Sequence, residues 1–300
     1  MTISYRLGIF LLVFMPDVHL KQFILETLSG SELRGDMRWK RGTGDERGGQ
    51  LPVIIVCHGF KAYKDWGPFP AIGEHFAHAG FVSIVFNFTH NGIGKEPRKF
   101  SERQKFFSNT ISFELEDVES LVEGITSGKI EDGRLDASRI GIVGHSRGGG
   151  VAIIKASEDR RIKAVAGWST VARFARHTEA QAKRWREKGF LGPPSATHDD
   201  PFVVGTALLD DLELNAARLD IGRAVKWLHK PLLLVHGTAD LPVPIEETNH
   251  LYDVADKTLT EYIVLQGAGH MYGARHPYTH EAPTLVHVLG ITSAWFHKHL

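Results

Sequence analysis

One segment of the sequence combines a serine and two glycines in a spacing that suits nucleophilic catalysis. The stretch RIGIVGHSRGGG places Gly144, His145, Ser146, Arg147 and Gly148 between an apolar run and a helix-prone segment. These five residues match the G-x-S-x-G pattern of a sharp strand-to-helix turn that exposes a serine hydroxyl. The two glycines would let neighbouring backbone approach the turn. The alternative interpretation is a glycine-rich turn with an incidental serine.

A histidine that could activate this serine lies near the end of the chain. A serine hydroxyl is a weak nucleophile and needs an adjacent base. His270 ends the sequence GAGH after a strand-like run at 262–265, and a loop at this place can carry the imidazole over the sheet edge. The alternatives His276, His280 and His287 follow it, the last of them inside a predicted helix. His270 is therefore the expected general base.

An aspartate between the serine and the histidine would complete a catalytic set. Asp240 lies in a turn after the strand-like run at 232–235. It would accept a hydrogen bond from His270, which fixes the tautomer of the base and stabilises its charged form. Asp253 and Asp256 are alternatives on a predicted helix, and a turn aspartate that bonds its own backbone is the purely structural interpretation.

Two backbone N–H groups are expected to form an oxyanion hole for the tetrahedral intermediate. One belongs to Arg147, directly after the serine, and the other to Phe60, in the loop after the strand-like run at 53–57. His58 in the same loop is expected to brace it, and Cys57 to pack in the core.

Strand-like and helix-like segments alternate along most of the chain. Apolar runs rich in β-branched residues occur at 53–57, 81–88, 139–143, 162–167, 232–235 and 262–265. Runs of this length suit strands buried on both faces of a parallel sheet. Segments with apolar residues near helical spacing occur at 72–79, 112–127, 149–157, 246–255 and 284–299. This order predicts a doubly wound α/β fold, preceded by a hairpin of strands at 22–28 and 33–40.

About fifty residues, 170–220, separate two of the predicted strands, whereas such connections usually have about 2–6 residues. Helix-prone pieces at 173–188 and 208–217 predict a cap or lid over a core made of residues 17–169 and 221–300.

Aromatic residues in and beside this insertion are candidate walls of a substrate pocket, or else the cap's own core. They are Trp168, Phe174, Trp185, Phe190 and Phe202. The basic residues of the first helix-prone piece favour an acidic substrate or form a solvated helix face.

The composition predicts a globular protein without a strong overall field. The 300 residues are 42% hydrophobic and 23% charged, which is too apolar for disorder. Lys plus Arg equals Asp plus Glu at 35 each, so no net charge steers the chain toward nucleic acid. The single cysteine cannot form an internal disulfide, and no Cys/His cluster has the spacing of a zinc site.

The N-terminal segment 1–16 has several interpretations. Its apolar run, LGIFLLVFM at 7–15, is shorter than the ~20 residues that a membrane-spanning helix needs. It could be the core of a signal peptide, but no small-residue cleavage site follows; alternatively, Met15 is the true start. We expect a cytoplasmic protein without an integral membrane span, or a secreted or periplasmic one if this segment acts as a signal.

Taken together and in order, the motifs resemble the α/β-hydrolase superfamily, and specifically its dienelactone-hydrolase-like and prolyl-oligopeptidase-like branch of serine esterases and peptidases. The motifs are HGF at 58–60, FNF at 86–88, GHSRGG at 144–149, HGTAD at 236–240 and GAGH at 267–270. The resemblance spans roughly residues 50–300. It implies an eight-stranded, mostly parallel sheet, a Ser–His–Asp triad, acyl transfer to water and no cofactor.

Two departures from that branch shape the expected activity. Dienelactone hydrolases proper use a cysteine nucleophile, whereas Ser146 stands here. We also expect no β-propeller before the catalytic part. We therefore expect hydrolysis of a small-molecule carboxylic ester through an acyl-enzyme. A peptidase of the acylaminoacyl- or dipeptidyl-peptidase type, or another acyl transfer on the same triad, is the first alternative. A non-catalytic ligand-binding member of the fold is the second, and the motifs select no acyl chain length or oligomeric state.

Overall fold

An eight-stranded sheet runs through the computed structural model, which describes residues 17–43, 49–130, 133–193, 195–198 and 200–300. The strands, in spatial order, are β1 (Val18–Glu26), β2 (Glu32–Lys40), β4 (Val82–Phe86), β3 (Leu51–Cys57), β5 (Leu135–His145), β6 (Ile162–Trp168), β9 (Leu232–Gly237) and β10 (Thr260–Leu265). β2 pairs antiparallel with both β1 and β4, and the other neighbours are parallel. The predicted doubly wound, mostly parallel sheet and its N-terminal hairpin are confirmed.

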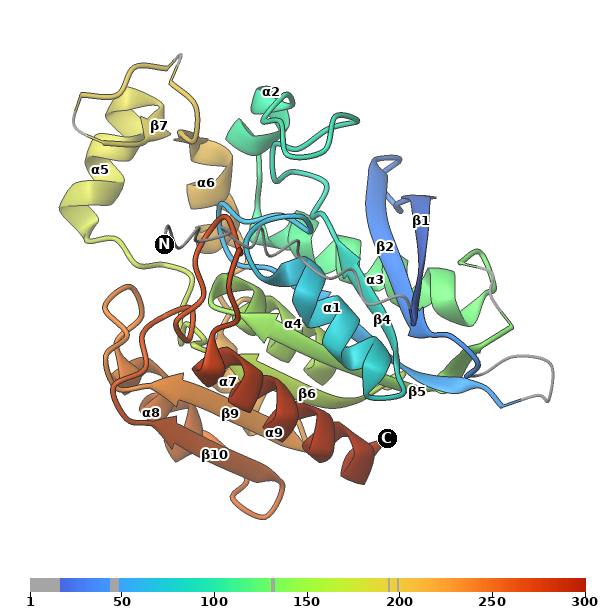
Figure 1. Ribbon diagram of the computed structural model, residues 1–300. Helices are drawn as coiled ribbons and strands as arrows, with labels where there is room; N and C mark the ends of the chain where they lie inside the picture. Colours follow the sequence, from blue (N-terminus) through green and yellow to red (C-terminus); the bar gives the residue numbers. More distant parts are fainter. Residues whose placement is uncertain (1–16, 44–48, 131–132, 194, 199) are drawn as a thin grey trace, which may run out of the picture.

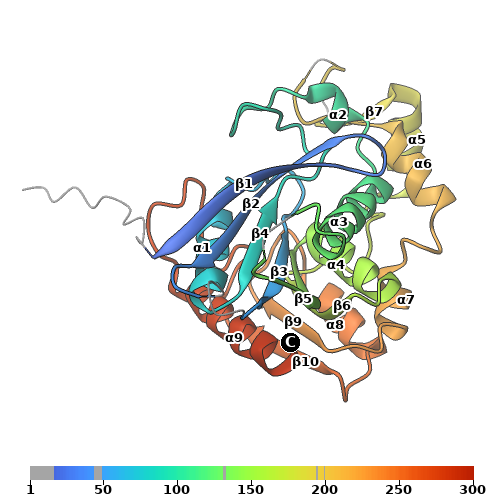
Figure 2. The ribbon, with the colours of Figure 1, turned by 90° about the vertical axis from the view of Figure 1, so that its right-hand side faces the viewer.

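Helices cover both faces of the sheet. On one face lie α1 (Phe69–His78) and α9 (Pro283–His299). On the other lie α3 (Ile111–Thr126), α4 (Arg147–Glu158), α7 (Ile221–Lys226) and α8 (Ile245–Val254), as Figures 1 and 2 show from two directions. Every residue of β4 and β9 is buried between these layers, which explains why both strands read as continuous apolar runs.

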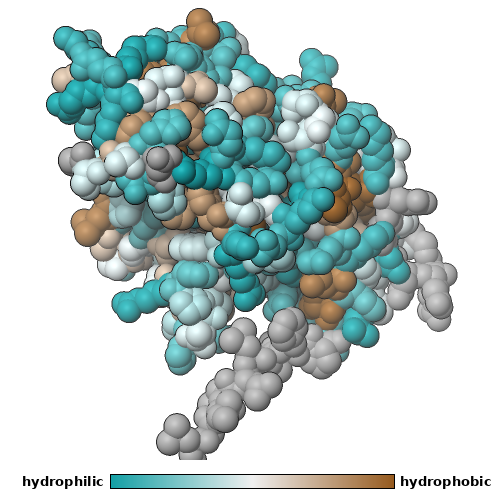
Figure 3. Space-filling view, turned by 90° about the horizontal axis from the view of Figure 1, so that it is seen from above, coloured by the Kyte–Doolittle hydropathy of each residue, from teal (hydrophilic) through white to brown (hydrophobic). Residues whose placement is uncertain are grey.

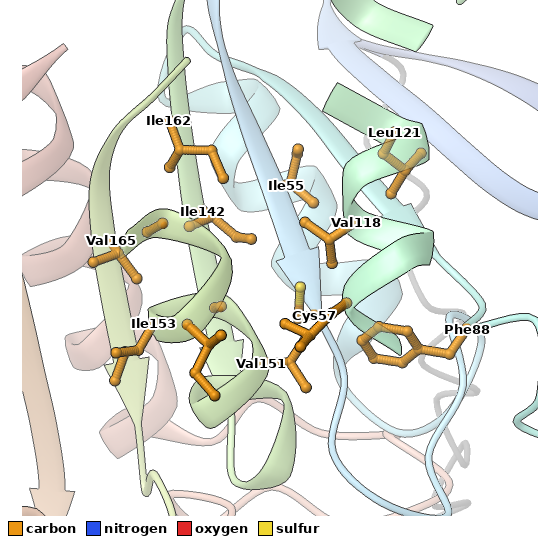
Figure 4. Close-up of a cluster of buried hydrophobic side chains, with 14 of the residues drawn as sticks. Ile55, Cys57, Phe88, Val118, Leu121, Ile142, Val151, Ile153, Ile162 and Val165 are labelled. Atoms are coloured by element: carbon orange, nitrogen blue, oxygen red, sulfur yellow. The ribbon is translucent and has the colours of Figure 1, made fainter. Parts of the chain in front are cut away.

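The larger part of the core lies between the sheet and the layer of α3 and α4. Ile55 and Ile142 on neighbouring strands belong to one cluster with Val118 of α3 and Ile153 of α4 (Figure 4). Cys57 is buried in the same cluster, so its predicted packing role agrees with its place.

Residues 170–220 hold four short elements apart from the main sheet. They are α5 (Glu179–Lys188), β7 (Phe190–Leu191), β8 (Val204–Gly205) and α6 (Thr206–Leu214), with β7 and β8 paired antiparallel. α5, β7 and α6 project together above the sheet, and α2 (Arg103–Phe107) lies beside them (Figures 1 and 2). α5 begins six residues later than predicted, because Thr178 caps it: the Thr178 hydroxyl accepts the N–H of Gln181.

The surface on the side of these elements is largely hydrophilic, with hydrophobic residues in small separate areas (Figure 3). Such scattered apolar residues are ordinary on a folded protein. No helix within the described ranges is long and apolar enough to cross a bilayer. The apolar run at 7–15 belongs to segment 1–16, which lies outside the described residues.

Burial of the central strands predicts a large difference between two identical substitutions. Ile55→Ala removes a fully buried side chain from β3 (0% exposed), whereas Ile24→Ala removes one that is 62% exposed on β1. We expect the first to lower the free energy of unfolding by about 2–5 kcal/mol and the second by less than about 1 kcal/mol. Urea unfolding followed by circular dichroism measures both. Similar losses for the two variants would contradict this layer arrangement.

Candidate active site

Ser146 lies at the sharp turn between β5 and α4. Its backbone has φ 57° and ψ −121°, a conformation that residues with a side chain rarely adopt. Three backbone hydrogen bonds hold it there. The Ser146 N–H donates to the carbonyl of Trp168 at 2.8 Å, and the Ser146 carbonyl accepts the N–H of Gly149 at 3.0 Å and the N–H of Val171 at 3.4 Å. The serine side chain therefore projects from a fixed, strained position at the end of a central strand.

Gly144 and Gly148 make this turn possible by close approach of backbone. A Cβ on Gly144 would lie 2.1 Å from the carbonyl oxygen of Gly148. A Cβ on Gly148 would lie 2.4 Å from the carbonyl oxygen of His58, in the loop after β3. Any side chain at either position would push the first turn of α4 away from β5 or from that loop.

His270 and Asp240 meet beyond the carboxyl ends of β10 and β9. The Nδ1 atom of His270 lies 2.8 Å from Oδ2 of Asp240. His145 Nε2 lies 2.9 Å from the carbonyl oxygen of His270, and the two rings are 4.6 Å apart. Within the described ranges, the Ser146 hydroxyl and His270 are not hydrogen-bonded to each other. Such a bond often tightens only when substrate is bound. The structure thus brings the histidine and the aspartate together and holds the histidine against the residue before Ser146.

The Asp240 carboxylate is buried and surrounded by donors. Its Oδ1 accepts the N–H of Val243 at 2.9 Å, and His236 Nε2 lies 3.2 Å from its Oδ2. Burial alone would raise the pKa of Asp240. The hydrogen bonds from His236, His270 and Val243 outweigh that effect and hold the pKa well below its ordinary value. The carboxylate is therefore ionised at neutral pH and placed to stabilise a charged imidazole.

His236 is a site residue that the sequence analysis did not identify. Its Nδ1 lies 2.6 Å from the Thr248 hydroxyl of α8, and its Nε2 lies 2.8 Å from the Val243 carbonyl. This fully buried ring fixes the turn that carries Asp240. The HGTAD motif contains both His236 and Asp240, so the sequence could have drawn attention to the histidine. Its role is visible only from its contacts.

The two N–H groups expected to form the oxyanion hole are free to donate. Neither Phe60 N–H nor Arg147 N–H forms a hydrogen bond to another residue within the described parts of the chain. A Cβ on Gly59 would lie 3.2 Å from the Cβ of Ser146, so the loop that carries Phe60 passes directly beside the serine. The guanidinium of Arg147 lies over the Phe60 ring, 5.0 Å from its centre.

His58 braces this loop from inside. Its Nδ1 lies 2.9 Å from the Gly59 carbonyl, and its Nε2 accepts the N–H of Phe88 at 3.3 Å and contacts the Asn91 side chain at 3.3 Å. Burial lowers the pKa of His58 to about 4, so the ring is neutral at physiological pH. These contacts agree with the bracing role expected from the sequence.

A cavity of about 230 Å³ opens at Ser146. Phe60 and Arg147 belong to its lining, with Ile111 of α3 and residues of the segment between β6 and β9. Most residues of that segment in the lining are apolar, but Arg173, Arg176 and His177 also belong to it. Phe174 and Trp185, two of the predicted wall residues, belong to this lining.

The other three predicted wall residues lie elsewhere. Trp168, at the end of β6, points to the opposite face of the sheet, where its Nε1 donates to the hydroxyl of Thr292 at 3.1 Å. Phe190 packs in a small cluster under the β7–β8 pair. The Phe202 ring contacts Phe100, with ring centres 4.5 Å apart. The alternation of side chains between the two faces of a strand decides where Trp168 points, and local packing places Phe190 and Phe202. Neither can be predicted from the presence of an aromatic residue alone.

The other candidates for base and acid form no comparable pair. His276 accepts a hydrogen bond from a backbone N–H before α1, and the exposed His280 and His287 do not contact an aspartate. Asp253 and Asp256 are exposed. Among the described residues, no three His, Cys, Asp or Glu side chains gather in a way that could hold a metal ion.

Comparison with known proteins gives one family. The model described as "Alpha/beta hydrolase family" matches residues 54–283. An Escherichia coli protein, "Uncharacterized 31.7 kDa protein in traX-finO intergenic region", is 23% identical over 83% of this chain and 91% of its own length. "Putative esterase YitV" of Bacillus subtilis (strain 168) is 25% identical over 70% of this chain and 77% of its own. The crystal structure of an esterase domain from Rhodothermus marinus matches with a TM-score of 0.62 and 18% identity, over 94% of this chain and 99% of that one, which shows the shared fold.

The buried His58 predicts a pH-dependent stability. Its pKa is about 4 in the folded protein, against about 6.5 for a histidine in an unfolded chain, so on acidification the unfolded chain takes up a proton first. The free energy of unfolding should therefore fall from pH 6.5 to 4, by up to ~1.4 kcal/mol per pH unit from this residue. In His58→Gln the free energy of unfolding should fall less steeply over this pH range, by up to ~1.4 kcal/mol per pH unit, as measured by urea unfolding. Above pH 7.5 the two proteins should share one slope; equal slopes at acidic pH would contradict the prediction.

Proposed function

The chain is a member of the alpha/beta hydrolase family, and from this premise we propose that it hydrolyses carboxylic esters through an acyl-enzyme formed on Ser146. One observation carries the proposal: a histidine bonded at 2.8 Å to a buried, ionised aspartate is held against the residue that precedes a serine at a strained strand-to-helix turn. This is the arrangement that activates a serine hydroxyl as a nucleophile.

The proposed reaction has two halves. Ser146 Oγ attacks the ester carbonyl carbon while His270 accepts the hydroxyl proton, and the carbonyl oxygen becomes an oxyanion. As the intermediate collapses, the bond to the alcohol oxygen breaks and the alcohol leaves with the proton from His270. Water then gives a proton to His270 and attacks the acyl carbon. The bond from this carbon to Ser146 Oγ breaks, His270 returns the proton to Oγ, and the acid leaves the restored serine. Asp240 keeps its charge throughout and stabilises the imidazolium in both halves.

The unpaired N–H groups of Phe60 and Arg147 would hold the oxyanion. A donor that is already in place costs no reorganisation when negative charge develops. Arg147 is the first residue of α4, so its N–H also lies at the positive end of the helix dipole. The names of the similar proteins, which include esterases, agree with an ester substrate.

Residues 170–220 serve in this proposal as a cap on the core formed by residues 17–169 and 221–300. Phe174, Trp185 and Leu208 of this segment contribute to the cavity wall, so the segment would shape the space that receives the substrate. Apolar walls with a few polar groups are typical of small-molecule sites.

Replacement of the nucleophile tests the proposal directly. Ser146→Ala should lower kcat/KM for p-nitrophenyl acetate by on the order of 10⁴-fold or more, because no acyl-enzyme can form. It should also abolish labelling by a fluorophosphonate probe. Ser127→Ala, at the exposed end of α3, is the matched control and should behave as wild type. Retained turnover in Ser146→Ala would refute the assignment, and a wild-type protein that resists the probe would favour a ligand-binding role.

The role of the acid predicts a second kinetic result. Asp240→Asn should keep the fold but lower kcat by about 10³–10⁴-fold, because the amide cannot select the same tautomer or stabilise the imidazolium. Steady-state kinetics beside circular dichroism measures the effect. Asp253→Asn, on the exposed side of α8, is the control. A folded Asp240→Asn protein with wild-type kcat would show that another group orients the base.

A further inference from the structure

The cavity at Ser146 has an apolar wall with a basic part. Three arginines, Arg147, Arg173 and Arg176, belong to its lining, and the lining residues include no aspartate or glutamate. A neutral ester with a hydrocarbon chain requires none of these charges. The partners of each arginine indicate what kind of ligand group would complete the site.

Two of the three arginines are paired with carboxylates that do not line the cavity. Arg147 Nη2 lies 2.9 Å from Glu114 Oε1 of α3. Arg176 lies 2.9 Å from Glu247 of α8 and also donates to the carbonyl of Pro242 at 2.8 Å. These pairs hold the two side chains in the wall and offset much of their charge.

Arg173 has no such partner. Its side chain is exposed at the cavity, and it forms no ion pair or hydrogen bond with any residue in the described ranges. A guanidinium binds a carboxylate through two parallel hydrogen bonds, which makes it well suited to recognise that group. The charge of Arg173 is thus available to a ligand.

Arg147 adds a second, independent observation. Its side chain is only 12% exposed, and Nη2 contacts Glu114, but the buried Nε has no hydrogen-bond acceptor within the described chain. A buried donor without an acceptor is rare and costly in folded proteins. An anionic group in the cavity would supply the acceptor that Nε lacks.

We propose that the ester taken by this site carries a carboxylate, which Arg173 pairs with and which the free Nε–H of Arg147 helps to hold. The inference rests on the proposed function, since it concerns the same cavity and the same serine. A carboxylate at the end of the acyl chain and one on the leaving alcohol share this chemistry, and the experiment below separates them.

The experiment compares matched anionic and neutral esters. The acyl-side pair is monoethyl adipate and ethyl hexanoate, and the alcohol-side pair is 4-carboxyphenyl butyrate and 4-methylphenyl butyrate. For each pair, the measured quantity is the kcat/KM of the anionic ester divided by that of the neutral ester. For one pair, this ratio should fall about tenfold in Arg173→Gln, because the variant loses one charge-assisted hydrogen bond to the carboxylate. Arg173→Lys should keep most of the ratio, because it retains the positive charge. The pair that responds identifies the side that carries the carboxylate.

The control variant is Arg184→Gln, an exposed arginine of α5 that is not part of the cavity lining and should leave both ratios unchanged. Binding of adipate to the Ser146→Ala protein, measured by calorimetry, should weaken about tenfold when Arg173→Gln is added, which tests the inference without turnover. If both ratios and adipate binding change less than about twofold in Arg173→Gln, the inference is overturned. Ester hydrolysis that still depends on Ser146 would then leave the proposed function standing, whereas hydrolysis that survives Ser146→Ala would overturn the function instead.

Discussion

The site depends on how closely the first turn of α4 approaches β5 and the loop after β3. At Gly144 and Gly148 the backbone atoms of these segments leave no room for a Cβ, and between them Ser146 takes a positive φ. The same approach has a second effect. The first N–H groups of a helix have no partner within the helix, so the turn that exposes the serine also leaves the N–H of Arg147 free beside it. The proposed nucleophile and the proposed oxyanion donor are thus products of one backbone arrangement, which explains why the motif requires small residues at fixed places.

The second constraint is the burial of a charge. An ionised carboxylate with no exposed surface is costly unless donors surround it. Asp240 meets this condition through His270, His236 and the N–H of Val243, which together overcome the effect of burial on its pKa. These donors come from the loop after β10, from β9 itself and from the turn before α8. The carboxylate therefore joins separate segments of the chain at one point, and the position of the imidazole follows from this network more than from the histidine's own loop.

The sequence predicts those parts of the fold and of the site that follow a simple, repeated physical pattern. Buried parallel strands must be apolar on both faces, so β3, β4, β6 and β9 were visible as continuous runs, and the sharp turn at Ser146 was visible as its glycines. The site residues whose roles depend on three-dimensional contacts were not. His236 is an ordinary strand-end histidine until its bonds to Thr248 and Val243 are seen. Trp168 and Trp185 are both tryptophans in or next to the insertion. The face of β6 to which Trp168 points, and the packing of α5 around Trp185, decide that only Trp185 lines the cavity. The short elements α2, β7, β8 and α7 span too few residues for a periodic pattern to appear.

Packing, more than surface charge, sets the shape of the cavity beneath α5 and α6. Arg186 joins these helices through Asp210 and Glu213, but this exposed network is screened by solvent and contributes little. Trp185 is 2% exposed, and its Nε1 donates to the Val204 carbonyl at 3.1 Å, so it ties α5 to β8 while it forms part of the wall. Loss of a buried tryptophan typically costs about 3–5 kcal/mol, far more than an exposed ion pair. A protein that keeps Trp185 can therefore vary its surface charges around α5 without changing the space over Ser146, and a change in that space has to come from the residues that line the cavity.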